Sequence, residues 1–185
     1  MTRRQIIFFS CKASRYITHM KKLTDPEESL RQFSQVLNAF GRKLGVVLFQ
    51  LPPHLALNLE RLEIFLATLP KGIKYAFEFR HISWFCPSVY QLLESYNMAL
   101  CFYDYKGYQS PEIPTADFVY VRLHGPKKKP YEGHYSKETL EDYAQKCLGW
   151  SEQGKTVFFY FDNSKKACAP LDAKDLIAYI REKEA

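Results

Sequence analysis

Six short stretches of the chain are typical of strands, and in several of them apolar and polar residues alternate as in strands that bury one face. In the stretch 75–85 (YAFEFRHISWF), Tyr75, Phe77 and Phe79 fall on one face. Glu78 and Arg80 fall on the other face, at the carboxyl end. The other stretches cover residues 6–12, 46–51, 99–104, 118–124 and 157–163. We therefore expect six strands, each with a charged or amide residue at its carboxyl end.

Helical patterns separate these stretches. Pro26 and Pro87 are typical first helical residues, and Asn58 and Ser136 are typical helix caps. Strict alternation of strand and helix indicates a parallel sheet with right-handed crossovers. An open doubly wound sheet and part of a (β/α)8 barrel both fit this pattern. No glycine-rich phosphate turn follows the early strands, and polar residues at nearly every strand exit favour the barrel.

Length and composition favour one domain spanning residues 1–185. The formal net charge of +6 favours anionic partners. The five cysteines lack zinc-site spacing and are odd in number, which argues against a zinc site or a disulfide framework. Without an apolar run of membrane-spanning length or a signal-peptide core, we expect a cytoplasmic protein with no membrane partner.

Acidic and imidazole side chains at the strand ends are candidates for acid–base chemistry. Glu78 shares its strand face with Arg80, and His124 shares one with Arg122. The predicted catalytic residues are Glu78, His124, Asp162 and Asp104. Their oxygen and nitrogen atoms also suit a divalent cation, but separate strands provide no fixed metal-binding spacing, so we assign no cofactor.

Basic residues outnumber acids at the predicted strand ends, which favours a phosphate or carboxylate group on a substrate. Aromatic residues there could stack on a sugar ring or a base. The predicted substrate-binding residues are Lys12, Arg15, His19, Gln50, Arg80, His81, Trp84, Arg122, Tyr131, Tyr135 and Asn163.

Six motifs together resemble one known family. They are KASRYITH (residues 12–19), LFQLPP (48–53), YAFEFRHISWF (75–85), FVYVRLHG (118–125), YEGHY (131–135) and YFDN (160–163). In order and spacing they resemble the YecE-like family, catalogued as domain of unknown function 72 (DUF72). The resemblance implies a TIM-type barrel and supplies no established reaction.

The resemblance also shows two departures. Family members carry roughly 60–70 more residues before the first motif, in line with a barrel of about 250 residues. We therefore expect a (β/α)8 barrel that lacks its first two strands and keeps six parallel strands. Second, Ser164, Ala167, Cys168 and Asp172 stand where the family pattern has Asp, Gly, Tyr and Asn.

Three functions stay open on this basis. The first is a barrel hydrolase or lyase that acts on an anionic small molecule, phosphorylated or sugar-like. In it Glu78 would be the acid or base and His124 the proton carrier. Arg80 and Arg122 would bind the anionic group of the substrate. A glycosidase variant would pair Glu78 with Asp104 or Asp162. The second is a non-catalytic binder of nucleic acid or another anion. The third is an inactive truncated remnant that self-associates through open sheet edges.

Overall fold

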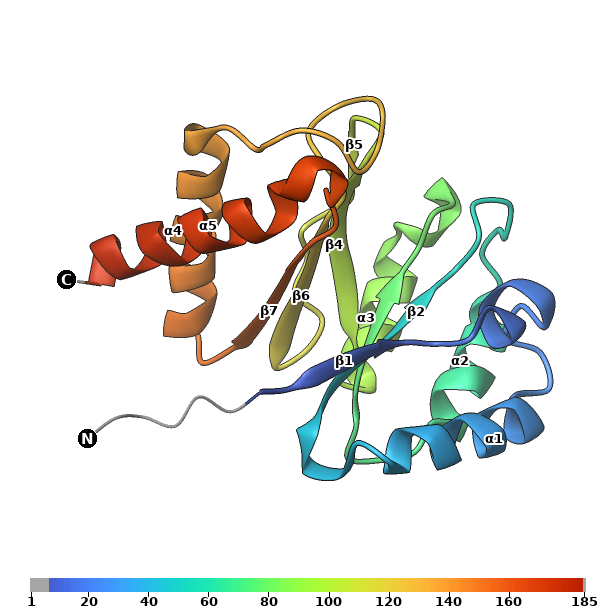
Figure 1. Cartoon of the computed structure of the whole chain (residues 1–185). Coiled ribbons are helices and arrows are strands. Elements are labelled where there is room, and N and C mark those ends of the chain that lie inside the picture. Colours follow the sequence, from blue (N-terminus) through green and yellow to red (C-terminus); the bar gives the residue numbers. More distant parts are fainter. Residues whose placement is uncertain (1–6, 185) are drawn as a thin grey trace. The chain divides into compact units, whose positions relative to one another are not determined.

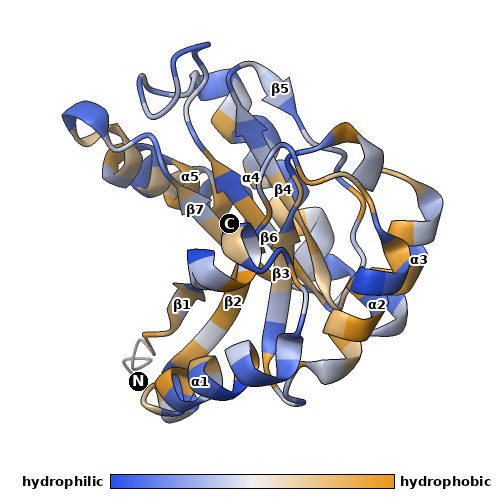
Figure 2. Cartoon of the chain, turned by 90° about the vertical axis from the view of Figure 1, so that its right-hand side faces the viewer, coloured by the Kyte–Doolittle hydropathy of each residue, from blue (hydrophilic) through white to orange (hydrophobic). Residues whose placement is uncertain are grey.

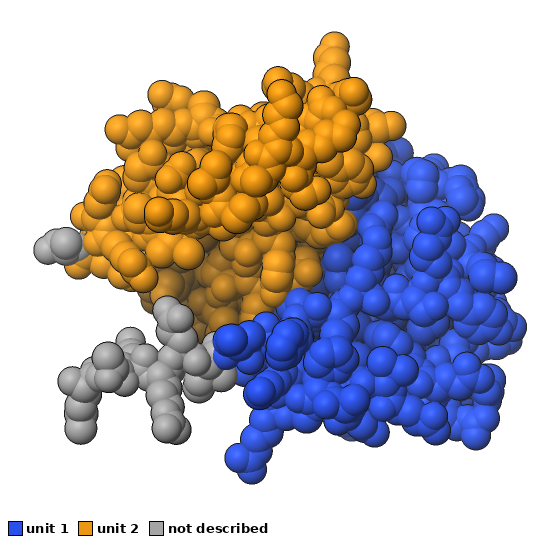
Figure 3. Space-filling model, viewed as in Figure 1, with its two compact units in different colours: residues 1–99 blue, residues 100–185 orange. Residues whose placement is uncertain are grey.

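The computed structural model describes residues 7–184 of the chain (Figure 1). Ile6, the first residue of the first predicted strand, lies outside the described residues. The chain divides into two compact units, residues 1–99 and residues 100–185 (Figure 3). Each unit is described below by itself, and the expectation of a single domain stays a prediction.

Unit 1 contains a parallel sheet in which β2 lies between β1 and β3. The strands are β1 (Phe9–Lys12), β2 (Leu44–Gln50) and β3 (Lys74–Glu78). Helices α1 (Pro26–Asn38), α2 (Leu59–Thr68) and α3 (Pro87–Ser95) connect or follow them, with short helical turns η1 (Tyr16–Met20), η2 (Gly41–Lys43) and η3 (Ile82–Trp84).

The expected helix starts are confirmed in unit 1. Pro26 and Pro87 are the first residues of α1 and α3. Asn58 caps α2, because its side chain accepts a hydrogen bond of 2.8 Å from the backbone N–H of Arg61. These local signals fix where each helix leaves the preceding loop.

Stacked aromatic rings form the core of unit 1. Phe49 on β2 lies in register with Phe77 on β3, and their ring centroids are 5.3 Å apart. Phe65 of α2 packs edge-on against Phe49 at 5.1 Å, and Phe33 of α1 does so at 6.2 Å. Phe49, Phe65 and Phe77 are fully buried. The apolar face of the sheet is thus covered by α1 and α2, leaving the opposite face for the polar strand ends.

Unit 2 contains three further parallel strands, of which β6 lies between β4 and β7. The strands are β4 (Ala99–Tyr105), β6 (Phe118–Leu123) and β7 (Thr156–Phe161); the helices are α4 (Lys137–Glu152) and α5 (Cys168–Glu184), with a short turn η4 (Lys165–Ala167). A short strand β5 (Tyr108–Gln109), outside the six expected strands, pairs antiparallel with β4.

Helices α4 and α5 contact each other and β7. Tyr143 of α4 packs edge-on against Phe159 at 5.2 Å, and Trp150 packs against Phe102 of β4 at 5.7 Å. Ser136 caps α4 as expected, accepting a hydrogen bond from the N–H of Thr139 at 3.3 Å. In Figure 2 hydrophobic residues follow the strands, whereas helices such as α1 and α2 show both hydrophobic and hydrophilic residues. Strands β2, β3, β4 and β6 are mostly buried, whereas β1 and β5 contain no buried residue.

The expected fold class is confirmed for residues 7–184. The fold is α/β, with six parallel strands that alternate with helices, as in a partial TIM-type barrel. Of the helices that the structure describes, none combines the length and the apolar character needed to cross a membrane.

Replacing Phe49 with alanine is expected to destabilise the protein by about 3–5 kcal/mol, because the change leaves a cavity among Phe33, Phe65 and Phe77. Urea unfolding measures the loss. Ile64→Ala is the control, since Ile64 is 54% exposed on α2 and its removal should cost less than about 1 kcal/mol.

Urea unfolding of Phe49→Ala, followed by fluorine NMR, also tests the expectation of a single domain. Trp84 lies in unit 1 and Trp150 in unit 2, so 5-fluorotryptophan gives one fluorine resonance from each unit. A single cooperative domain requires that Phe49→Ala lowers the unfolding midpoint of both resonances equally. A shift confined to the Trp84 resonance contradicts that expectation.

Candidate functional site

The polar ends of the strands in unit 1 share one face of the sheet. Gln50, the last residue of β2, is in register with Glu78, the last residue of β3. Lys12 ends β1, and its Nζ donates a hydrogen bond of 2.5 Å to Oε1 of Gln50. Parallel pairing therefore brings three of the predicted residues together at the carboxyl edge of this sheet.

Glu78 and Arg80 form a buried ion pair. Nε of Arg80 donates to Oε1 of Glu78 at 2.6 Å, and Nη2 contacts the same oxygen. The side chains are 0% and 8% exposed. A carboxylate at this depth needs a compensating charge, and Arg80 provides it. This ion pair restrains both side chains. A substrate anion bound by Arg80, as predicted, would therefore compete with Glu78 for the guanidinium group.

A group of basic side chains lies beside this edge, and we call Lys12, Arg15, His19 and His54 the basic cluster. Arg15 precedes η1, His19 lies within η1, and His54 follows the exit of β2. Partial burial lowers the pKa of His19 below its ordinary value, and the charges of Arg15, Lys12 and His54 lower it further. Arg15, Lys12 and His54 are thus each close enough to His19 to act on it electrostatically.

Two side chains of η3 hold the loop that carries His54. Ser83 Oγ accepts a hydrogen bond of 2.8 Å from the N–H of Leu57. Trp84 Nε1 donates to the carbonyl of Leu55 at 2.7 Å. Nδ1 of His81 accepts from the backbone N–H of Ser83 at 3.3 Å and lies 2.8 Å from its Oγ. These bonds fasten the segment after Pro53 to the end of β3.

Trp84 does not present a face to a ligand. Its side chain is 1% exposed, and its ring lies parallel to that of Phe79 at 4.6 Å. The structure therefore gives this residue a packing role in place of the ring-stacking role that its position suggested.

In unit 2, Arg122, His124 and Asp162 lie together at the exits of β6 and β7. Nη2 of Arg122 donates to Oδ2 of Asp162 at 2.6 Å. Nε2 of His124 lies 3.6 Å from the same oxygen. Arg122 is 17% exposed and Asp162 35% exposed, whereas the His124 side chain is 1% exposed. The carboxylate of Asp162 is thus shared between a guanidinium and an imidazole.

The backbone fixes the tautomer of His124. Its Nδ1 lies 2.7 Å from the carbonyl oxygen of Asp104, which can only accept a hydrogen bond. Nδ1 therefore carries the proton, and in the neutral ring Nε2 holds the lone pair. The ring sits among Tyr103, Tyr105 and Tyr131, with centroids 5.5–6.3 Å away. This arrangement can accept or deliver a proton at Nε2.

Asp104 lies on the other face of the sheet from Arg122. The register pairs Asp104 with Leu123, whereas Tyr103 pairs with Arg122. Oδ1 of Asp104 accepts the N–H of His124 at 2.5 Å, and Oδ2 accepts the hydroxyl of Tyr135 at 2.5 Å. Both carboxylate oxygens of Asp104 thus hold bonds within the fold, and its predicted catalytic role stays a prediction.

Tyr135 anchors the loop between β6 and α4. Its hydroxyl accepts the N–H of Gly125 at 2.6 Å while donating to Asp104. Burial, and then the nearby Asp104 carboxylate, raise the pKa of Tyr135 above its ordinary value, which keeps the hydroxyl protonated. The side chain is 7% exposed and its ring contacts Phe161. Tyr135, like Trp84, therefore packs inside the fold, whereas Tyr131 is 39% exposed.

Gly125 makes the closest backbone approach in this loop. Its φ is +108°, and a Cβ atom there would lie 2.8 Å from the carbonyl oxygen of Glu132 and 3.4 Å from Cβ of Asn163. Only glycine therefore fits without displacing the loop.

Asn163 and Asp172 form a buried polar contact beside this loop. Nδ2 of Asn163 donates to Oδ2 of Asp172 at 2.6 Å and to the carbonyl of Gly133 at 2.8 Å. Asp172 also accepts from Nδ1 of His134 at 2.7 Å and from the N–H of Tyr135 at 3.2 Å. Asp172 stands where the family pattern has Asn, and here its carboxylate receives three donors.

Residues 7–184 contain no group of three or more His, Cys, Asp and Glu side chains placed to hold a metal ion. Each unit instead offers charged side chains at its strand ends. The basic cluster in unit 1 suits an anion, and the His124–Asp162 contact in unit 2 suits proton transfer.

Sequence reasoning did not single out His54 or Ser83. His54 directly follows the Pro52-Pro53 pair at a strand exit, which is the signal that could have identified it. Ser83 falls two residues after His81, a spacing typical of a local side-chain-to-backbone turn.

Replacing Tyr135 with phenylalanine is expected to reduce stability by about 1–3 kcal/mol, because the N–H of Gly125 and the carboxylate of Asp104 each lose a buried partner. Denaturant unfolding measures the change. Tyr179→Phe is the matched control, since Tyr179 lies on α5 and is only partly buried. Equal stability of the two variants would contradict the anchoring role of Tyr135.

Comparison with solved structures identifies proteins of the same fold. A DUF72 family protein from Thermotoga maritima matches with a TM-score of 0.81 and 25% sequence identity, over 96% of this chain and 74% of that one. A DUF72 family protein from Enterococcus faecalis matches with a TM-score of 0.79 and 18% identity, over 94% and 74% of the two chains. A further DUF72 family structure from Enterococcus faecalis matches with a TM-score of 0.62 and 20% sequence identity, over 90% of this chain and 70% of that one.

Comparison of the sequence itself gives the family. No curated protein matches the chain. The family profile described as "Protein of unknown function DUF72" matches residues 5–185, nearly the whole sequence. The resemblance inferred from the six motifs is thereby confirmed, and the chain belongs to the DUF72 family of proteins of unknown function.

Proposed function

We propose that this DUF72 protein binds a small anionic molecule, phosphorylated or carboxylated, at the carboxyl edge of the sheet in unit 1. The observation that carries the proposal is the position of the basic cluster: Lys12 ends β1 and bonds to Gln50 at the end of β2, and Arg15, His19 and His54 follow the exits of these two strands. In parallel α/β folds the carboxyl ends of the strands are the usual place for a ligand.

The carboxylate of Glu78 does not cancel the positive charge of the basic cluster. Glu78 is engaged by Arg80 within hydrogen-bonding distance, so its negative charge is compensated beneath the surface. Lys12 and Arg15 are exposed, and His19 is half-buried. An incoming oxyanion would therefore meet Arg15 and Lys12 as charged donors and His19 as a group that can gain a proton.

Sulfate is a suitable probe, because its charge stays constant between pH 5.5 and 7.5. Arg15→Ala is expected to weaken sulfate binding about tenfold, equivalent to ~1.4 kcal/mol. Isothermal titration calorimetry gives the affinity. Arg42→Ala is the matched control, because Arg42 lies in η2 just before β2, at the amino edge of the same sheet. Equal affinity of both variants and the native protein would overturn the proposal.

The affinity for sulfate is also expected to rise as the pH falls from 7.5 to 5.5. His19 has a lowered pKa and is neutral at the upper end; a bound anion favours its protonated form, so binding takes up a proton. His19→Asn should reduce this dependence. An affinity that does not change with pH in the native protein counts against His19 as a ligand.

We further propose that His124 and Asp162 carry proton transfer, as a hydrolase or lyase acting on an anionic substrate requires. The supporting observation is the fixed tautomer of His124, with Nδ1–H on a backbone carbonyl and Nε2 beside the half-exposed carboxylate of Asp162. Arg122 orients that carboxylate through a bond of 2.6 Å. His124 would act as the base or acid, and Asp162 would stabilise its protonated form.

A panel of phosphate esters and sugar phosphates tests this second proposal. Any turnover by the native protein is expected to fall at least about 100-fold in His124→Asn, because the proton carrier is lost. His134→Asn is the control, since His134 is a half-exposed residue bonded to Asp172. Equal loss in both variants, or turnover that survives in His124→Asn, contradicts the assignment.

Three further parts of the proposal concern partners and location. The loop lysines Lys127, Lys128 and Lys129 could hold nucleic acid instead, which predicts binding that weakens steeply with salt.

The open edges of β1 and β7 could pair with a second copy, which predicts a concentration-dependent mass. A cytoplasmic location accords with five free cysteines.

A further inference from the structure

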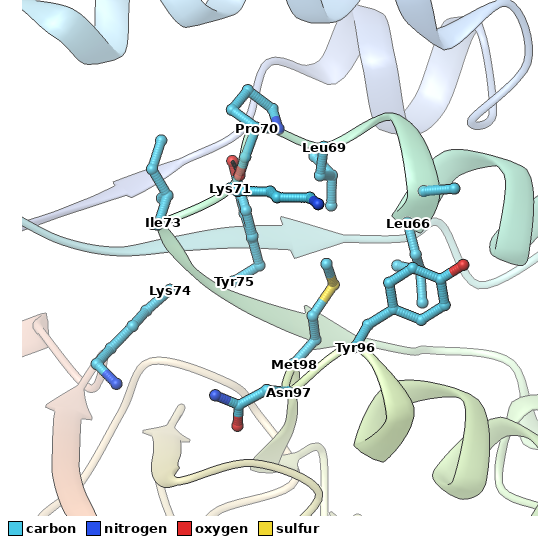
Figure 4. A pocket seen from close by; sticks show the side chains of 12 residues that line it. Leu66, Leu69, Pro70, Lys71, Ile73, Lys74, Tyr75, Tyr96, Asn97 and Met98 are labelled. Carbon is cyan, nitrogen blue, oxygen red and sulfur yellow. Dashed lines mark hydrogen bonds between the residues drawn. The ribbon is translucent and has the colours of Figure 1, made fainter.

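A cavity lies among residues 66–98 of unit 1, away from the basic cluster (Figure 4). Its volume is about 460 Å³, within the range of pockets that hold small organic molecules. Its walls come from the end of α2, the turn and first residues of β3, and the segment that follows α3.

The interior of the cavity is apolar. Leu66, Tyr75 and Met98 lie at its base, where the fold covers most of their surface, and the partly exposed Pro70, Ile73 and Tyr96 provide the apolar surface that faces the open space. Figure 4 shows Leu69 and Pro70 on one side of the cavity and Met98 and Tyr96 on the other. The hydroxyl of Tyr75 donates to the carbonyl of Pro70 at 3.0 Å, which fixes its ring as part of the wall. An occupant of this space therefore needs a hydrophobic body.

The rim of the cavity is positively charged. Lys71 and Lys74 are among the lining residues, and none of the lining residues within 66–98 is Asp or Glu. Figure 4 shows the side chain of Lys71 running along the cavity toward Leu69, whereas the amine of Lys74 points away from Met98. Lys71 is thus the cation placed to meet a charged group on an occupant.

This cavity is separate from the anion site proposed above. Strand β3 begins at Lys74, beside the cavity, and ends at Glu78. The basic cluster adjoins the carboxyl ends of β1 and β2, whereas the cavity adjoins the amino end of β3. A ligand here therefore leaves the other edge of the sheet accessible.

We propose that this cavity binds a small monocarboxylate with an aromatic or short aliphatic body. The body packs against the partly exposed Pro70, Ile73 and Tyr96, with Met98 at its inner end, and the carboxylate pairs with Nζ of Lys71 at the rim. The hydrophobic interior provides the driving force, and the single lysine selects a carboxylate over a neutral or cationic analogue of the same shape.

Methionine methyl NMR on the full chain tests the proposal, with 4-phenylbutyrate as the probe. Met98 lines the cavity, whereas Met20 in η1 is 73% exposed and serves as an internal control. The Met98 methyl resonance, assigned with Met98→Leu, is expected to shift and saturate while that of Met20 stays in place. An unshifted Met98 resonance at millimolar probe overturns the proposal.

Two comparisons test the role of the charge. Lys71→Ala is expected to weaken 4-phenylbutyrate binding about three- to fivefold, the effect of one partly exposed ion pair, while Lys174→Ala on α5 leaves it unchanged. The neutral analogue 4-phenylbutanol should bind native protein and Lys71→Ala equally. If 4-phenylbutylamine binds as tightly as the carboxylate, or Lys71→Ala has no effect, the assignment of a carboxylate ligand is wrong.

The outcome is independent of the anion site in unit 1. Sulfate should not shift the Met98 methyl resonance, because it has no hydrophobic body to enter the cavity. A Met98 shift caused by sulfate alone would contradict a separate apolar site.

Discussion

The register of the parallel strands is the constraint on which the two candidate sites depend. Once Phe49 pairs with Phe77 beneath the helices, the next residues, Gln50 and Glu78, must emerge together on the opposite face. In unit 2 the pairing of Arg122 with Tyr160 likewise brings Arg122 near the exit of β7, where Asp162 follows. Packing of apolar faces against the helices thus positions polar groups that have no packing role of their own.

The alternation of residue types was sufficient to predict most of this framework. The strand expected over 46–51 is Leu44–Gln50, and the one expected over 118–124 is Phe118–Leu123. Helix starts at Asn58 and Ser136 follow from short-range chemistry that the sequence displays directly. The two-residue strand β5 was missed, because it pairs through backbone bonds to β4 that leave no alternating pattern.

The candidate sites were less predictable, and the reasons are specific. The segment ALCFYD (99–104) is almost wholly apolar, so nothing in it shows which face Asp104 occupies; only its pairing with Leu123 decides this. Trp84 and Tyr135 have the composition of ring-stacking residues, yet both are buried, because their polar atoms bond to Leu55, Asp104 and Gly125 inside the fold. His54 belongs to no periodic pattern at all.

Gly125 has a consequence for how this architecture can vary. One added methyl group at position 125 would collide with the backbone of Glu132 and press on Asn163, so only glycine fits there. The lysine-rich segment that follows takes no part in that contact. Insertions and substitutions during divergence should therefore accumulate between residues 126 and 129, whose exposed side chains can be replaced while the loop still returns to the same point beside β7.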